Sequence, residues 1–283
     1  MSTRAEILVT ATEVTELRNA GDPLTILDVR WSLAEPDGRG PYTNGHIPGA
    51  VYVSLEDDLS DHGAAGRGRH PLPTGSALEA AARRWSIRRD APVVVYDDWN
   101  RAGSARAWWV LTATGIPGVR ILDGGLSAWV AAGGALETGT VAPAPGDVTV
   151  GYDDLYAGAR RTLTADEAAS ATRLIDARAP DRFRGEVEPV DAVAGHIPGA
   201  TNLPSTRMLR DSGEFLGETE LVRLVEERGV VGHGDIGVYC GSGVTAAVVI
   251  AALAGIGVDA ALFPGSWSEW SAAQTRPVAR GSG

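Results

Sequence analysis

Cys240, the one cysteine of the 283-residue chain, is the side chain whose type and position could carry covalent chemistry. It directly follows an apolar run, residues 236–239, which predicts a buried strand. A loop with two glycines comes next, and then an apolar run over Ala246–Leu253 that predicts a helix. In a parallel sheet this order places the thiol at the carboxyl end of a strand, where open α/β folds bind their ligands.

The loop after Cys240 could hold an anion on the sulfur. Its two glycines permit positive φ angles, so that successive N–H groups can converge on one point at the positive end of the next helix. Such a cradle would stabilise a thiolate or a persulfide. We therefore expect a nucleophilic Cys240 and a binding loop made of Gly241, Ser242, Gly243, Val244, Thr245 and Ala246. The alternative is an inert core cysteine, which is common beside apolar strands.

The chain also contains an internal duplication. Gly45–Ala50 recurs with identical residues as Gly195–Ala200, and several weaker matches follow in the same order. A repeat of this length indicates duplicated domains rather than a solenoid. We expect an N-terminal domain over 1–140 and a C-terminal domain over 152–283, joined by a linker over 141–151 that contains two prolines and two glycines.

Short β-branched runs alternate with helical patterns in both halves. The predicted strands are 24–29, 51–53, 93–96, 120–122, 174–177, 201–203, 236–239 and 261–263. The predicted helices of the first half are 12–19, 76–84, 104–114 and 126–131. Thr10 with Glu13, and Thr164 with Glu167, have the spacing of a capping box at a helix start. The predicted fold class is α/β, with two tandem domains that each have a parallel sheet and helices on both faces.

The first half lacks the nucleophile. Asp97 stands where the second half has Cys240, and the loop that follows it, residues 98–103, is longer and bulkier. We therefore expect the first half to be inactive and to form one wall of a site that belongs to the second half.

Composition excludes several classes of function. The formal charge is -11, from 25 basic and 36 acidic side chains, which argues against a nucleic-acid surface. All the basic residues are arginine, so chemistry that needs a lysine amine is excluded. One cysteine can form neither an internal disulfide nor a cysteine-rich metal site. No apolar run reaches membrane-spanning length and the N-terminus lacks a secretory signal, so we expect a cytoplasmic protein with no membrane partner.

The repeated Gly-His-Ile-Pro-Gly-Ala segment and the Cys-Gly-Ser-Gly-Val-Thr-Ala loop resemble the tandem-domain rhodaneses, the thiosulfate and 3-mercaptopyruvate sulfurtransferases. The resemblance implies an active C-terminal domain, an inactive N-terminal domain and a site between them. It implies that Cys240 takes sulfur from a small donor, holds it as a persulfide and passes it to a thiol acceptor such as thioredoxin, or to cyanide. It implies no cofactor and no metal.

The resemblance also implies roles for other side chains. Arg182 corresponds to an arginine that binds the donor, and the neutral residues after Cys240 are similar to the mercaptopyruvate-type loop. In that subgroup Ser242 would form a proton relay with His46 and an acid, for which Asp37 is the candidate. A second arginine is usual in that subgroup, but Val190 stands at its place. The donor therefore stays open between 3-mercaptopyruvate and thiosulfate.

Two other functions are alternatives to sulfur transfer. A cysteine-loop phosphatase needs an arginine six positions after the cysteine, and this chain has Ala246 there. A sulfide-responsive binding module without turnover is the second alternative. A cysteine kept together with an intact glycine loop argues against it.

Overall fold

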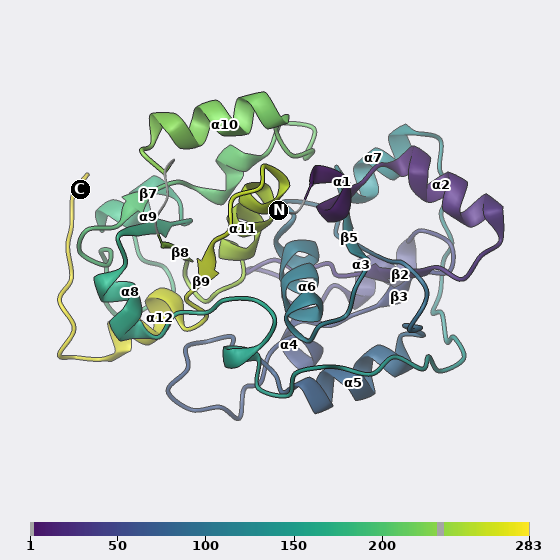
Figure 1. Cartoon of the computed structure of the whole chain (residues 1–283), viewed down its shortest axis with the longest axis horizontal. Helices are drawn as coiled ribbons and strands as arrows, with labels where there is room; N and C mark the ends of the chain where they lie inside the picture. The colour runs from purple at the N-terminus through teal and green to yellow at the C-terminus, as the bar shows by residue number, and fades with distance from the viewer. Residues whose placement is uncertain (1–2, 231–234, 283) are drawn as a thin grey trace.

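Two parallel sheets lie one after the other along the long axis of the molecule (Figure 1). The structure is a computed structural model, and it describes residues 3–230 and 235–282. The strand order is β1-β5-β4-β2-β3 in the first sheet and β7-β6-β8-β9 in the second, and all neighbouring strands are parallel. The predicted fold class is confirmed. Among the described residues, no helix has the length and apolar character needed to cross a membrane.

The first half alternates strands with helices as expected from its patterning. Its strands are β1 (Leu8–Val9), β2 (Thr25–Asp28), β3 (Val51–Tyr52), β4 (Val93–Tyr96) and β5 (Val119–Leu122). Its helices are α1 (Arg4–Ile7), α2 (Ala11–Ala20), α3 (Arg39–Asn44), α4 (Leu55–Asp58), α5 (Gly75–Arg84), α6 (Ala102–Ala113) and α7 (Gly125–Ala131). The predicted strands of this half agree with the observed ones to within one or two residues, except that β1 was not predicted.

The second half repeats this order. Its strands are β6 (Arg173–Asp176), β7 (Thr201–Asn202), β8 (Ile236–Tyr239) and β9 (Ala261–Leu262). Its helices are α8 (Ala165–Ser170), α9 (Pro180–Arg184), α10 (Glu218–Glu227), α11 (Ala246–Gly255) and α12 (Ser266–Ala272), with 3-10 turns at Leu155–Ala157 and Ser205–Met208. Thr162 forms a single parallel bridge to Leu262, which is the counterpart of the β1–β5 pairing. Both predicted capping boxes are present, at Thr10 and at Thr164.

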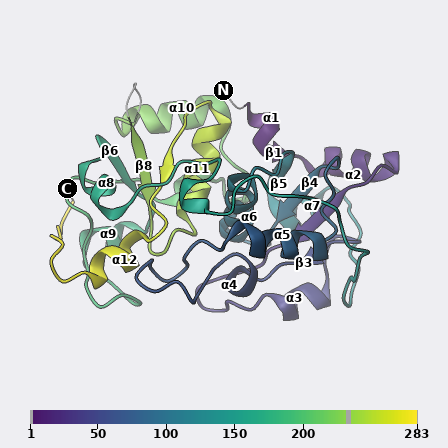
Figure 2. The ribbon, with the colours of Figure 1, turned by 60° about the horizontal axis from the view of Figure 1, so that its bottom comes forward.

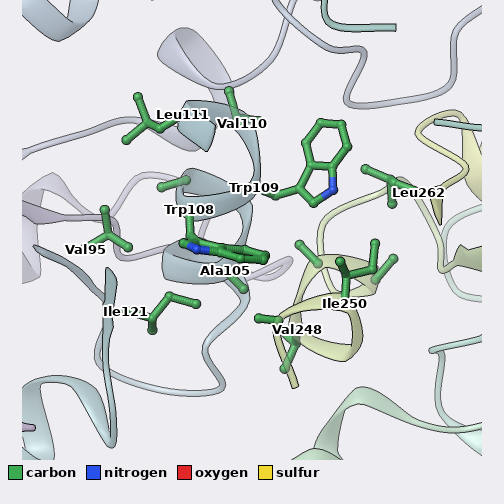
Figure 3. Packing of buried hydrophobic residues seen from close by; sticks show 14 of the residues in the cluster. Val95, Ala105, Trp108, Trp109, Val110, Leu111, Ile121, Val248, Ile250 and Leu262 are labelled. Carbon is green, nitrogen blue, oxygen red and sulfur yellow. The ribbon is translucent and has the colours of Figure 1, made fainter. Parts of the chain in front are cut away.

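The two halves share a core between α6 and α11. Both helices are buried along almost their whole length, which fits their apolar composition on all faces. Figure 3 shows Trp108 and Trp109 of α6 in one cluster with Val248 and Ile250 of α11. All four side chains are at most 2% exposed. This shared core fixes the two sheets relative to each other, so that loops of the first half can reach the sheet edge of the second.

Candidate active site

Cys240 lies at the carboxyl end of β8, directly before the loop that leads into α11. The residue is 2% exposed, and its N–H donates to Oγ of Ser266 at 3.1 Å. The N–H groups of residues 241–246 donate to no acceptor in the part of the chain that the structure describes. Buried amides are almost always paired in folded proteins. A run of unpaired amides beside a buried thiol is therefore an arrangement suited to an anion on the sulfur.

Ser266 holds the backbone of Cys240 at the cost of local strain. Its φ is +53°, in the left-handed region that side chains other than glycine rarely adopt. Gly125 stands at the equivalent position of the first half with a φ of +57°. In the second half a serine replaces the glycine, and its hydroxyl accepts from Cys240 and donates to the carbonyl of Phe263 at 2.9 Å. Strain of this kind concentrates at functional sites.

We expect one added methyl group at Gly243 to disturb the loop that follows Cys240. The φ of Gly243 is +78°, and a Cβ atom there would lie 2.6 Å from the carbonyl oxygen of Pro264. We expect Gly243→Ala to displace the loop and to slow persulfide formation roughly 10²- to 10³-fold, as loss of one oxyanion-hole donor does. Gly199→Ala is the matched control, because Gly199 has a φ of +82° with nothing within 4 Å of its Cβ position. Equal persulfidation rates in the two variants, measured by intact-mass spectrometry, would contradict a role for the loop amides.

The first half contains the same kind of cradle, filled by its own carboxylate. Asp97 is 2% exposed at the carboxyl end of β4. Its side chain accepts from the N–H groups of Trp99 at 3.1 Å, Arg101 at 3.2 Å and Ser104 at 3.0 Å, and from the Ser104 hydroxyl at 2.7 Å. The loop amides that are free after Cys240 are thus occupied in the first half by a fixed anion.

Ser242 takes part in a chain of hydrogen bonds with two side chains of the first half. The Ser242 hydroxyl lies 2.7 Å from Nδ1 of His70, and Nε2 of His70 lies 3.1 Å from Oε1 of Glu56. The indole of Trp31 donates to the same Oε1 atom at 2.7 Å, and its ring meets the imidazole edge-on at a centroid distance of 5.7 Å. A hydroxyl, an imidazole and a carboxylate in this order can move a proton.

The protonation states of this relay follow from burial and charge. Burial lowers the pKa of His70 to about 4; nearby Glu56 opposes that shift and the guanidinium of Arg106 adds to it. Burial would raise the pKa of Glu56, but the Trp31 hydrogen bond and the neighbouring histidines outweigh it and lower the pKa. At neutral pH the imidazole is therefore neutral and the carboxylate ionised. Nε2–H then donates to Glu56, and Nδ1 accepts from the hydroxyl of Ser242.

The structure joins Ser242 to His70 and Glu56, and it does not bring the expected His46 and Asp37 into this chain of hydrogen bonds. Nδ1 of His46 lies 2.9 Å from the carbonyl oxygen of Tyr42, and the His46 ring stacks on the Tyr42 ring. His196 has the same arrangement on Phe183 in the second half, so the repeated histidine serves the fold of both domains. Asp37 is exposed and accepts from the N–H of Arg39 and the hydroxyl of Tyr52.

Two guanidinium groups approach the residue that follows Cys240. A Cβ atom on Gly241 would lie 3.4 Å from Nη2 of Arg69 and 3.5 Å from Nη1 of Arg182. Arg182, expected from the sequence, comes from α9 of the second half, whereas Arg69 comes from the first half and was not predicted. Val190, at the place of the expected second arginine, is 39% exposed.

Arg106 of α6 lies fully buried behind the loop. Its guanidinium donates to the carbonyl oxygens of Gly243 at 3.3 Å, His70 at 3.0 Å and Leu59 at 2.9 Å. Burial lowers the pKa of Arg106 to about 10. Because the same group binds the Cys240 loop and the backbone of His70, Arg106 helps to fix the spacing between that loop and His70.

Comparison with known proteins identifies the family. The family model for the rhodanese-like domain matches the chain twice, at residues 10–132 and 160–273. The chain belongs to the rhodanese family. A Mycobacterium tuberculosis relative, SseB, named as a thiosulfate sulfurtransferase, is 65% identical over the whole length of both chains. The 3-mercaptopyruvate sulfurtransferase of Escherichia coli K12 is 39% identical over 265 residues, which cover 91% of this chain and 92% of the relative.

A solved rhodanese-fold structure is also similar. The crystal structure of SseA from Escherichia coli, described as a 3-mercaptopyruvate sulfotransferase, superposes with a TM-score of 0.79 at 35% identity. It covers 92% of this chain and 98% of the SseA chain. The family and the class of enzyme expected from the motifs, a tandem-domain sulfurtransferase, are thereby confirmed.

Proposed function

We propose that this rhodanese uses 3-mercaptopyruvate as its preferred sulfur donor and carries the sulfur as a persulfide on Cys240. The observation that carries the choice of donor is the hydrogen-bonded chain from Ser242 through His70 to Glu56. A carbon leaving group must be protonated, and this relay can store and return one proton. Relatives at 39% and 34% identity, from Escherichia coli and Homo sapiens, are named 3-mercaptopyruvate sulfurtransferases.

One proton moves through the relay during the reaction with 3-mercaptopyruvate. The Cys240 thiol gives its proton to the Ser242 oxygen while the hydroxyl proton of Ser242 passes to Nδ1 of His70, and Glu56 stabilises the imidazolium. The thiolate attacks the donor sulfur, the S–C bond breaks, and its electrons form the enolate of pyruvate. The relay returns the proton to the enolate carbon. Cys240 is left as a persulfide, and pyruvate departs.

The cradle and the arginines act on charge. The unpaired amides of residues 241–246 would stabilise the thiolate and then the persulfide, as an oxyanion hole stabilises a developing negative charge. The forked donors of Arg182 suit the carboxylate of the donor. In this proposal the second half is the catalytic domain. The first half has no thiol of its own and supplies His70 and Glu56 to the shared site.

Thiosulfate is the second candidate donor. The relative with 65% identity is named for it, and two guanidinium groups beside Gly241 suit a dianion. For thiosulfate the thiolate attacks the outer sulfur and sulfite leaves with the bonding electrons. No carbon is protonated, so this reaction does not need the relay to return a proton.

Intact-mass spectrometry tests the proposal. We expect the protein to gain one sulfur atom when it is incubated with 3-mercaptopyruvate and to release one pyruvate per persulfide. Cys240→Ser should gain none. We expect kcat/KM for 3-mercaptopyruvate to exceed that for thiosulfate at least about 100-fold, the lower end of the contribution of one proton-transfer group. No added sulfur with either donor would refute the proposed function, and a preference for thiosulfate would refute the choice of donor.

The proposed acceptor of the sulfur is a thiol. A persulfide transfers its outer sulfur to a thiolate nucleophile, so a dithiol protein such as thioredoxin is the proposed partner and cyanide is the assay acceptor. The proposed compartment is the cytoplasm, where an enzyme with a single free cysteine stays reduced.

A further inference from the structure

We propose that Arg69 is a donor-binding residue supplied by the first half. We also propose that the carboxylate of Asp191 occupies the position of the donor anion between Arg69 and Arg182 until the donor binds. This inference rests on Cys240 as the sulfur carrier. It adds to the site a specificity residue from the domain that lacks a nucleophile.

Arg69 reaches the site because its loop crosses from one half to the other. Figures 1 and 2 show the segment between α4 and α5 extending from the first half towards α12 of the second. The backbone N–H of Arg69 donates to Oγ of Ser268 in α12 at 3.0 Å. A Cβ atom on neighbouring Gly68 would lie 2.5 Å from the carbonyl oxygen of Gly265. The backbone of this loop is therefore held closely against the second half.

The side chain of Arg69 is directed at the residue after the nucleophile. Its Nη2 atom lies 3.4 Å from a Cβ position on Gly241, and Nη1 of Arg182 lies 3.5 Å from the same position. Two planar cations that meet beside one glycine of an anion-binding loop form a site for an oxyanion such as a carboxylate or a sulfonate.

Asp191 joins the two arginines. Its Oδ1 atom lies 2.9 Å from Nη1 of Arg69, and its Oδ2 atom lies 3.5 Å from Nη2 of Arg182. The Asp191 side chain is 8% exposed, and Oδ2 has no hydrogen-bond partner among the described residues. Nη2 of Arg182 also binds Glu188 at 2.6 Å, so Arg182 keeps a carboxylate partner without Asp191. The contact from Asp191 to Arg182 is thus loose, and a donor anion could take it over.

Alkylation of the single cysteine tests this assignment without any sulfur donor. Iodoacetate carries a carboxylate as the donor does, whereas iodoacetamide has the same reactive carbon and no charge. The ratio of their second-order rate constants with Cys240 reports anion binding beside the thiol. Both constants are measured at the high-pH plateau, where the thiol is fully ionised, so that a change in thiol ionisation cancels.

We expect Arg69→Gln to lower the iodoacetate-to-iodoacetamide ratio roughly tenfold, because one charge-assisted contact is lost. Arg67→Gln is the matched control. It removes the same charge from the same loop, but Arg67 is exposed and its guanidinium lies over the ring of Tyr156, 4.5 Å from the centroid. Its ratio should stay within about twofold of the wild type, since exposed charges are largely screened. Asp191→Asn should raise the ratio at least about threefold, because it removes a competing anion.

An equal fall in Arg67→Gln and Arg69→Gln would show a general charge effect and overturn the role of Arg69. So would a ratio in Arg69→Gln that matches the wild type. An unchanged or lower ratio in Asp191→Asn would overturn the role of Asp191. These outcomes differ from failure of the proposed function, which is absence of the persulfide in the wild-type protein. In turnover, Arg69→Gln should raise KM for an anionic donor about tenfold and leave kcat within about threefold, since binding rather than chemistry is weakened.

Discussion

His70→Asn is expected to lower kcat for 3-mercaptopyruvate by about 10²- to 10⁴-fold, the usual contribution of a general acid–base. The asparagine can still accept a hydrogen bond from the Ser242 hydroxyl, but it cannot hold the proton that the enolate must receive. Turnover of thiosulfate should fall less than about tenfold, because sulfite leaves without protonation of a carbon. The measurement is kcat with each donor on the same preparation, with pyruvate and sulfite as the detected products.

Two acids provide a matched pair for this experiment. Glu56→Gln removes the carboxylate bonded to Nε2 of His70, and it should shift the donor ratio in the same direction as His70→Asn. Asp37→Asn removes the exposed acid that lies outside the relay, and it should leave the ratio unchanged. Equal losses with both donors in His70→Asn would mean that the imidazole organises the site without carrying the proton.

The same histidine sets a pH dependence. Burial lowers the pKa of His70 to about 4, below its value in an unfolded chain. Between about pH 6.5 and 4 the unfolded chain therefore binds more protons at this residue than the folded one, so the fold loses stability as the pH falls through that window. His70 stays neutral above about pH 5, so its titration should cause no change in kcat above that pH.

The duplication within the sequence helps to separate functional residues from structural ones. Cys240 is predicted to be functional from its place between a buried strand and a glycine-containing loop, and the repeat supports this because the first half has Asp97 at the same position. The same reasoning identifies His46 and His196 as structural, since both halves keep them and both rings bind a backbone carbonyl. His70 has no counterpart in the repeat, and this difference between the two halves could have indicated a functional residue. The sequence-based assignment of the relay instead followed the conspicuous Gly-His-Ile-Pro-Gly motif.

Some of the site could not be found from sequence patterning. Arg69 and Glu56 lie in a loop and a short helix that patterning did not predict, and they reach Cys240 only because α6 and α11 fix the two halves together. That packing brings together side chains more than 150 positions apart, which no local pattern encodes. The strands, by contrast, were predicted closely, since their buried runs are local properties of the chain.

Asp97→Ala is expected to destabilise the first half by about 3–5 kcal/mol, because it leaves a buried charge without its partner. Asp97 and Arg101 form a salt bridge at 3.0 Å, and their side chains are 3% and 1% exposed. In a half of this size the loss corresponds to a melting temperature lower by about 10 °C, measured by calorimetry. Asp98→Ala is the control, since the Asp98 side chain is 40% exposed and its Oδ2 atom lies 3.9 Å from Nε of Arg30. This substitution should lower the stability by less than about 1 kcal/mol.

The stability of Asp97→Ala tests whether the equivalent loops of the two halves bind an anion for different purposes. In the first half the loop amides bind a carboxylate that is always present, so the cradle contributes to stability. In the second half the same amides are left free beside Cys240, so the cradle can bind an anion that forms only during the reaction. A melting temperature for Asp97→Ala within 2 °C of the wild type would mean that the fixed carboxylate contributes little to the fold, and the comparison between the two loops would fail. If the prediction holds, a persulfide on Cys240 should likewise raise the melting temperature of the protein.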